Sequence, residues 1–146
     1  MEIHVVQGLV IPQLPGCEDA WIPEGKLKDY ALSPEDPKGK HKARVFSSVL
    51  GIEQEDWQYL REQILERLPE YEAVLRDADT GYGQEWEVLV PIEGRNACTR
   101  YVATKWLIVN RSRPRPRLST LYVERSARKL REVNERYARR KAGLAP

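Results

Sequence analysis

The apolar positions in the first half of the chain recur mainly with helical spacing, after one predicted strand. The strand is the β-branched run 3–11, which ends at Pro12 because proline cannot donate to a sheet ladder. Pro23 fits the first turn of a short helix that reaches about Leu32, since its missing N–H costs nothing there. This segment therefore predicts a strand, a loop and a short helix.

Two longer amphipathic helices are predicted next. The first begins near Gly39 and ends at Gly51, because glycine is favoured at a helix C-terminal cap. The second covers about 54–68 and ends at Pro69. Both carry an apolar stripe at i, i+3, i+4 and i+7 spacing, formed by Val45, Phe46 and Val49 in the first helix and by Trp57, Leu60, Ile64 and Leu68 in the second.

Beyond residue 70 the apolar period changes to the alternation of strands, which are predicted at 71–76, 85–92, 98–109 and 117–123. In the strand 85–92 the apolar residues alternate with Glu85 and Glu87, which are expected to face outward. The charge-rich segment from 124 to about 141 predicts a helix. Helices followed by antiparallel strands indicate one α+β domain over 1–123, with a basic helical extension over 124–146.

Charge is divided unevenly along this chain. The 146 residues, the size of one domain, carry 24 Lys and Arg and 22 Asp and Glu, so the formal net charge is only +2. Residues 1–98, however, hold 10 basic and 19 acidic side chains, whereas residues 99–146 hold 14 basic and 3 acidic ones. The basic half predicts contact with RNA or another polyanion, or with a small acidic partner protein.

Several function classes are not supported by any motif. Cys17 and Cys98 form no CxxC or zinc spacing, and the two histidines form no HExxH, so neither a metal nor a cofactor is expected. The glycine-rich phosphate loops of nucleotide enzymes are missing from the sequence. The absence of an apolar leader or membrane span and the low cysteine content favour a cytoplasmic protein without membrane contact.

His41 and Lys42 are the first candidates for chemistry. Lys42 lies one turn before Val45 and Phe46, on the apolar face of its predicted helix. A lysine at such a position either extends past the edge of the core or points into a cleft, and His41 borders the same stripe. Structural and functional roles remain equally open for both residues at this point.

The predicted hairpin 98–123 adds hydroxyl groups. If residue 112 is its centre, Trp106 lies opposite Leu118 and Thr104 lies opposite Thr120. Two hydroxyls would then lie side by side on an apolar face, either as an ordinary cross-strand pair or as part of a site.

The tip of the same hairpin and the helix after it are rich in arginine. Arginines recur at alternate positions around Pro114 and Pro116, and the prolines stiffen the loop. Guanidinium groups bind phosphate oxygens with two parallel hydrogen bonds. The predicted nucleic-acid-binding residues are Arg111, Arg113, Arg115, Arg117, Arg125 and Arg128.

Several blocks of the sequence resemble an uncharacterised bacterial domain family, known as a domain of unknown function. Its genes resemble two-gene cassettes that encode a small partner alongside. The resemblance covers about residues 14–123, and its most specific block is G-x-H-K-A-R-x-F at 39–46. The other blocks are 20–23 (AWIP) with Lys26, Leu27 and Tyr30 after it, 32–34 (LSP), 50–51 (LG), 82–83 (YG), 104–108 (TKWLI) and 118–122 (LSTLY).

In layout this family is similar to the barnase–EndoU–colicin–RelE group of toxin ribonucleases. That resemblance implies a metal-independent endoribonuclease with a helix-borne His41 or Lys42 and a late-strand hydroxyl, Thr120. Thr104 and Tyr82 are further implied site residues. Arg100 is a possible substitute for a basic residue that related chains carry where this one has Ala103. A non-catalytic module that binds nucleic acid or an acidic protein is the alternative hypothesis.

Overall fold

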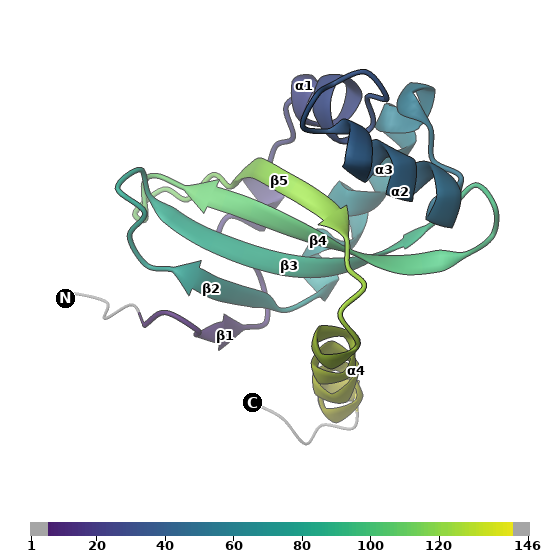
Figure 1. Ribbon diagram of the computed structural model, residues 1–146. Coiled ribbons are helices and arrows are strands. Elements are labelled where there is room, and N and C mark those ends of the chain that lie inside the picture. The colour runs from purple at the N-terminus through teal and green to yellow at the C-terminus, as the bar shows by residue number, and fades with distance from the viewer. Residues whose placement is uncertain (1–5, 142–146) are drawn as a thin grey trace.

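The computed structural model describes residues 6–141 and has two helical layers with one sheet between them. The sheet has five antiparallel strands in the order β1-β2-β3-β4-β5, which is the order of the chain. The helices that precede β2 cover one face, and α4 lies against the other (Figure 1). The predicted α+β class, with a helix after the sheet, is confirmed. The first predicted strand, 3–11, is wrong over 6–9, which include a turn, and only Val10–Ile11 pair with β2; residues 3–5 lie outside the described part.

The strands form where apolar and polar residues alternate, and this alternation decides which side chains point into the core. Trp86, Val88 and Val90 point into the layer between sheet and helices and pack with Phe46 and Leu60. Residues 6–141 contain no helix that is long and apolar enough to span a membrane. The strands are β1 (Val10–Ile11), β2 (Ala73–Asp77), β3 (Gln84–Glu93), β4 (Thr99–Ile108) and β5 (Arg117–Val123).

The helical layer contains two regular helices joined by short helical turns. The regular helices are α2 (Lys40–Leu50) and α3 (Trp57–Arg67). Gly51 ends α2 with φ 63°, a left-handed conformation that glycine adopts without strain. The remaining elements are η1 (Cys17–Asp19), α1 (Glu24–Lys26), the π-turn η2 (Leu27–Ala31), η3 (Gln54–Asp56), η4 (Leu68–Glu70) and, after the sheet, α4 (Ala127–Lys141).

The beginning of α2 is fixed in place by a side-chain cap and by a close approach to η2. The Asp36 carboxylate accepts the backbone N–H of Gly39 at 2.6 Å, which satisfies a donor that the helix itself leaves free. A methyl group on Gly39 would overlap the carbonyl oxygen of Tyr30. Glycine at this position therefore allows α2 to start directly against the backbone of η2.

The hairpin β4–β5 contains a β-bulge, so part of the predicted pairing is wrong. Trp106 does lie opposite Leu118, as expected. Ser119 is then an extra residue on β5, and its hydroxyl donates to the carbonyl of Lys105 at 3.1 Å. Beyond it the register is shifted by one position, which places Thr120 opposite Lys105. Thr104 and Thr120 are consequently not a cross-strand pair.

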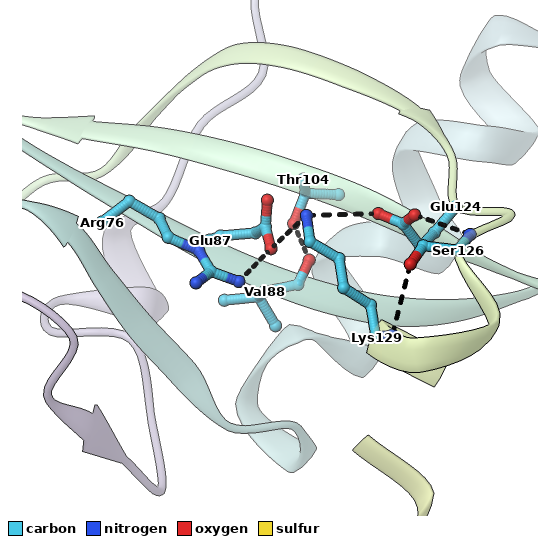
Figure 2. Close-up of polar contacts among 7 residues, drawn as sticks. All are labelled: Arg76, Glu87, Val88, Thr104, Glu124, Ser126 and Lys129. Atoms are coloured by element: carbon cyan, nitrogen blue, oxygen red, sulfur yellow. Dashed lines mark hydrogen bonds and ion pairs between the residues drawn. The ribbon is translucent and has the colours of Figure 1, made fainter. Parts of the chain in front are cut away.

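Glu87 is buried, although the sequence pattern predicts that it faces solvent. The residue does point away from α2 and α3, but α4 covers that face of the sheet and leaves Glu87 only 1% exposed. Arg76 Nη2 lies 2.7 Å from Glu87 Oε1, and Lys129 Nζ of α4 lies 3.5 Å from the same oxygen (Figure 2). The buried carboxylate is thus compensated by two cations.

Lys129 holds α4 to the sheet through these charges. Its ammonium also lies 3.5 Å from Glu124 Oε2, at the junction between β5 and α4. Burial by itself would lower the pKa of Lys129, but Glu87, Tyr122 and Glu124 outweigh it and raise that pKa above its ordinary value. The basic character of α4 therefore serves partly to neutralise acidic side chains of its own chain.

Thr104 lies in the core of the sheet and is fully buried. Its hydroxyl donates to the carbonyl of Val88 at 2.7 Å and accepts the indole N–H of Trp106 at 2.8 Å (Figure 2 shows the first contact). One hydroxyl thus satisfies a buried indole donor, which would otherwise lose its hydrogen bond to water.

Thr104→Val is expected to lower the free energy of unfolding by about 1–3 kcal/mol, because the Trp106 indole N–H is left without an acceptor. Urea unfolding followed by circular dichroism measures the change. Thr99→Val, at the exposed start of the same strand, is the control and should shift stability by less than about 0.5 kcal/mol. Equal unfolding midpoints for the two variants would contradict a structural role for Thr104.

Candidate functional site

Lys42 and Thr120 are 78 positions apart in sequence and in direct contact in the fold. Lys42 is half-buried on the face of α2 that packs near β5, the edge strand of the sheet. Its Nζ donates to Thr120 Oγ1 at 2.7 Å. Of the predicted catalytic residues, these are the two that the fold brings together.

Tyr30 of η2 completes this contact. The Lys42 ammonium lies 4.7 Å from the centre of the Tyr30 ring, and 6.0 Å from that of Tyr122. The neighbouring Lys42 ammonium, with a smaller contribution from Thr120, lowers the pKa of Tyr30 below its ordinary value, although burial acts in the opposite direction. A tyrosine in this environment gives up its proton more readily than an exposed one.

The three side chains lie at a cleft of about 470 Å³, a volume within the usual range for small-molecule sites. Lys42 is not part of the lining but contacts two of the residues that are. The lining consists of Pro23, Gly25, Lys26, Tyr30, Arg117, Ser119 and Thr120.

The charge of the cleft is positive. Lys26 and Arg117 line it, and Lys42 adds a third cation behind Thr120. Among the ion pairs between residues 6 and 141, none joins these three side chains to a carboxylate. Cations without carboxylate partners around a cleft attract anions, and phosphate groups suit such a set of donors.

The other predicted catalytic residues are placed elsewhere. His41 is exposed in the first turn of α2 and does not line the cleft, although it directly precedes Lys42 in the sequence. Thr104 is in the core. Tyr82 is 81% exposed in the turn between β2 and β3, and Arg100 is exposed near the start of β4, where it donates to the carbonyl of Thr99.

The predicted nucleic-acid-binding arginines are all exposed. Two of them lie near one aromatic ring: the guanidinium carbons of Arg115 and Arg117 lie 5.2 Å and 5.4 Å from the centre of the Trp21 ring. Arg128 of α4 forms an exposed ion pair with Glu132 at 3.3 Å. Arg117 is the member of the set that also lines the cleft.

Sequence reasoning did not identify Tyr30, Lys26, Ser119 or Trp21 as site residues. Tyr30 occupies a short π-turn, for which the sequence has no periodic signal, and its contact with Lys42 depends on the close approach at Gly39. All four residues lie in or beside blocks of the family resemblance, which were the available signal. Ser119 is the extra residue of the β-bulge, and the sequence pattern did not predict that bulge.

The arrangement combines the groups that phosphoryl chemistry uses. A phenol with a lowered pKa can exchange a proton, an ammonium can stabilise a developing negative charge, and a hydroxyl can orient an oxygen. Within residues 6–141 no group of three or more His, Cys, Asp or Glu side chains is arranged to hold a metal ion.

Comparison with known proteins places the chain in a family. No curated protein and no solved structure matches it. One family model does match, and it covers residues 13–125, which include every residue of the cleft and exclude α4. The chain therefore belongs to the family described as a domain of unknown function, DUF6883.

Proposed function

We propose that the protein is a metal-independent endoribonuclease-like toxin, of the barnase/RelE-like kind, and that its active site is the cleft beside β5. The observation that carries this proposal is the contact of Lys42 Nζ with Thr120 Oγ1 at 2.7 Å beside the Tyr30 ring. Metal-free cleavage of RNA requires a base, an acid and cations around the phosphate, and this cleft offers candidates for all three.

The proposed reaction is attack of a ribose 2′-oxygen on the adjacent phosphorus. Tyr30, as phenolate, takes the 2′-hydroxyl proton while the new phosphorus–oxygen bond forms. The bond to the 5′-oxygen breaks, and the Lys42 ammonium donates a proton to that oxygen. The Tyr30 phenol then returns the first proton to the neighbouring Lys42 amine. The products are a 2′,3′-cyclic phosphate and a 5′-hydroxyl, and no net proton is consumed.

Three further groups would hold the phosphate. Thr120 lines the cleft, so its hydroxyl could bind a phosphate oxygen there. Arg117 and Lys26 line the cleft and would neutralise the charge that grows in the transition state. The positive cleft therefore supports binding and catalysis with the same residues.

Binding without catalysis is the second candidate. It is favoured by the arginines of the loop between β4 and β5, whose exposed side chains make no ion pair with a carboxylate in the described part of the chain. Such a module would bind RNA, or a small acidic partner, with a steep salt dependence. It would not depend on the proton chemistry of Tyr30.

Lys42→Met is expected to reduce RNA cleavage about 100-fold or more, because it removes a donor to the transition state without a large change in volume. The assay follows a labelled oligoribonucleotide with excess protein in the presence of a chelator. Lys40→Met, at an exposed position of the same helix, is the control and should cleave like the wild type.

Intact RNA with the wild-type protein, or equal rates for Lys42→Met and Lys40→Met, would rule out the nuclease proposal. His41→Ala separates the two helix candidates. The Tyr30 proposal expects its rate to remain within a few-fold of wild type, whereas a loss as large as that of Tyr30→Phe would assign the proton transfer to His41.

The pKa of Tyr30 is expected to lie below the ordinary tyrosine value of 10.0 and to rise in Lys42→Met, since the neighbouring ammonium that lowers it is removed. Ultraviolet difference titration against Tyr30→Phe isolates this phenol among the tyrosines. Cleavage should increase as pH rises through the lowered pKa, because phenolate is the reactive form. An identical Tyr30 pKa in Lys42→Met and wild type would contradict this role.

Expression in a bacterial host is expected to arrest growth, and Lys42→Met should relieve the arrest, if the protein acts as the toxin of a two-gene pair. Growth curves after induction, with protein amounts matched by immunoblot, measure the effect. Normal growth with soluble wild-type protein would favour the binding module instead.

A further inference from the structure

Trp21 is an exposed aromatic residue that the fold holds rigidly beside the cleft. It is 37% exposed, yet its backbone is paired with the start of β5. Its N–H donates to the carbonyl of Pro116 at 3.0 Å, and its carbonyl accepts the N–H of Leu118 at 3.1 Å. An exposed indole at a fixed position loses little conformational freedom when a flat ligand stacks on it.

Two arginines are held against this indole without any acidic partner. The guanidinium carbons of Arg115 and Arg117 both lie within 5.4 Å of the ring centre, and within residues 6–141 neither arginine forms an ion pair with a carboxylate. Attraction between a cation and the indole face explains one such contact. The second arginine brings another positive charge near the same ring. An anion bound between the two guanidinium groups would relieve their repulsion.

The loop that carries these arginines is anchored on both sides. A methyl group on Gly16 would overlap the carbonyl oxygen of Pro114, so the two segments are in direct backbone contact there. Pro116 is fixed by its hydrogen bond to Trp21. Arg115 therefore lies between two anchored prolines, and its guanidinium is presented at the indole with few alternative backbone conformations.

The indole is continuous with the cleft through Arg117, which contacts the ring and also lines the cavity. Thr120 follows Arg117 on β5 at a distance of about 10 Å along the strand. The cationic surface thus extends beyond a single phosphate, and a stacking surface lies at its far end. That combination of spaced cations and an exposed aromatic ring is characteristic of single-strand nucleic-acid sites.

We propose that Trp21, Arg115 and Arg117 form a nucleotide subsite for single-stranded RNA. An unpaired base stacks on the exposed part of the Trp21 indole, and the two guanidinium groups bind the phosphate of that nucleotide. Bases in a duplex are stacked on one another and cannot reach the ring, so the subsite selects single strands. The assignment rests on the proposed function, because the cleft must hold the neighbouring phosphate of the same strand.

The test measures binding of a 2′-O-methyl oligoribonucleotide, which cannot be cleaved, by fluorescence anisotropy with the full chain. Trp21→Ala is expected to weaken binding of the single strand roughly tenfold, and Trp21→Phe should retain most of the affinity. Arg115→Ala should weaken it as well. Arg61→Ala is the matched control, since Arg61 also lies over an indole, 4.9 Å from the Trp57 ring, but outside the cleft.

The outcomes separate the subsite from the nuclease proposal. Wild-type affinity in both Trp21→Ala and Arg115→Ala, or equal binding of the single strand and its duplex, overturns the subsite and leaves the nuclease proposal standing. Selective loss in these two variants, with normal binding by Arg61→Ala, supports the subsite. Tight binding of the uncleavable strand without cleavage of ordinary RNA overturns the nuclease proposal alone, and no binding by the wild type overturns both.

Discussion

The candidate site depends on the contact between α2 and η2 at Gly39. Because glycine has no side chain, the start of α2 lies against the Tyr30 carbonyl, and Lys42, one turn further, reaches the Tyr30 ring. The ammonium is then held between aromatic rings and a hydroxyl with no carboxylate in ion-pair distance among the described residues. That environment lowers the pKa of Tyr30 and keeps the cleft positive.

The bulge in β5 is the second requirement. An edge strand tolerates an extra residue because, beyond its bridge to Trp21, only one side of it is paired within the sheet. The insertion changes which side chains face which partner. Without Ser119 as the extra residue, Thr120 would lie opposite Thr104, in a sheet face that packs into the core. With it, the hydroxyl is available to Lys42 at the edge.

The uneven charge of the chain has two separate explanations in the fold. On the face covered by α4, Lys129 neutralises the buried Glu87 and the neighbouring Glu124, so part of the basic excess is used within the molecule. On the cleft side, Arg115 and Arg117 have an indole for a partner in place of a carboxylate. Charge counts along the sequence cannot distinguish cations that neutralise buried carboxylates from cations at the cleft, because Lys129, Arg115 and Arg117 all come from the same half of the chain.

Local patterns were sufficient to predict the order of helices and strands, the two main helices and the last four strands, since periods of 3.6 and 2 residues depend on neighbours in sequence. They predicted too long a first strand, because residues 6–9 of the β-branched run lie in and around a turn. They also marked Lys42 as an unusual lysine on an apolar helix face. Three features required the tertiary structure: the shifted register at Thr120, the burial of Glu87 beneath α4, and the contact of Tyr30 with Lys42. Each depends on contacts between segments distant in sequence or on close backbone packing, and side-chain periodicity carries no information about either.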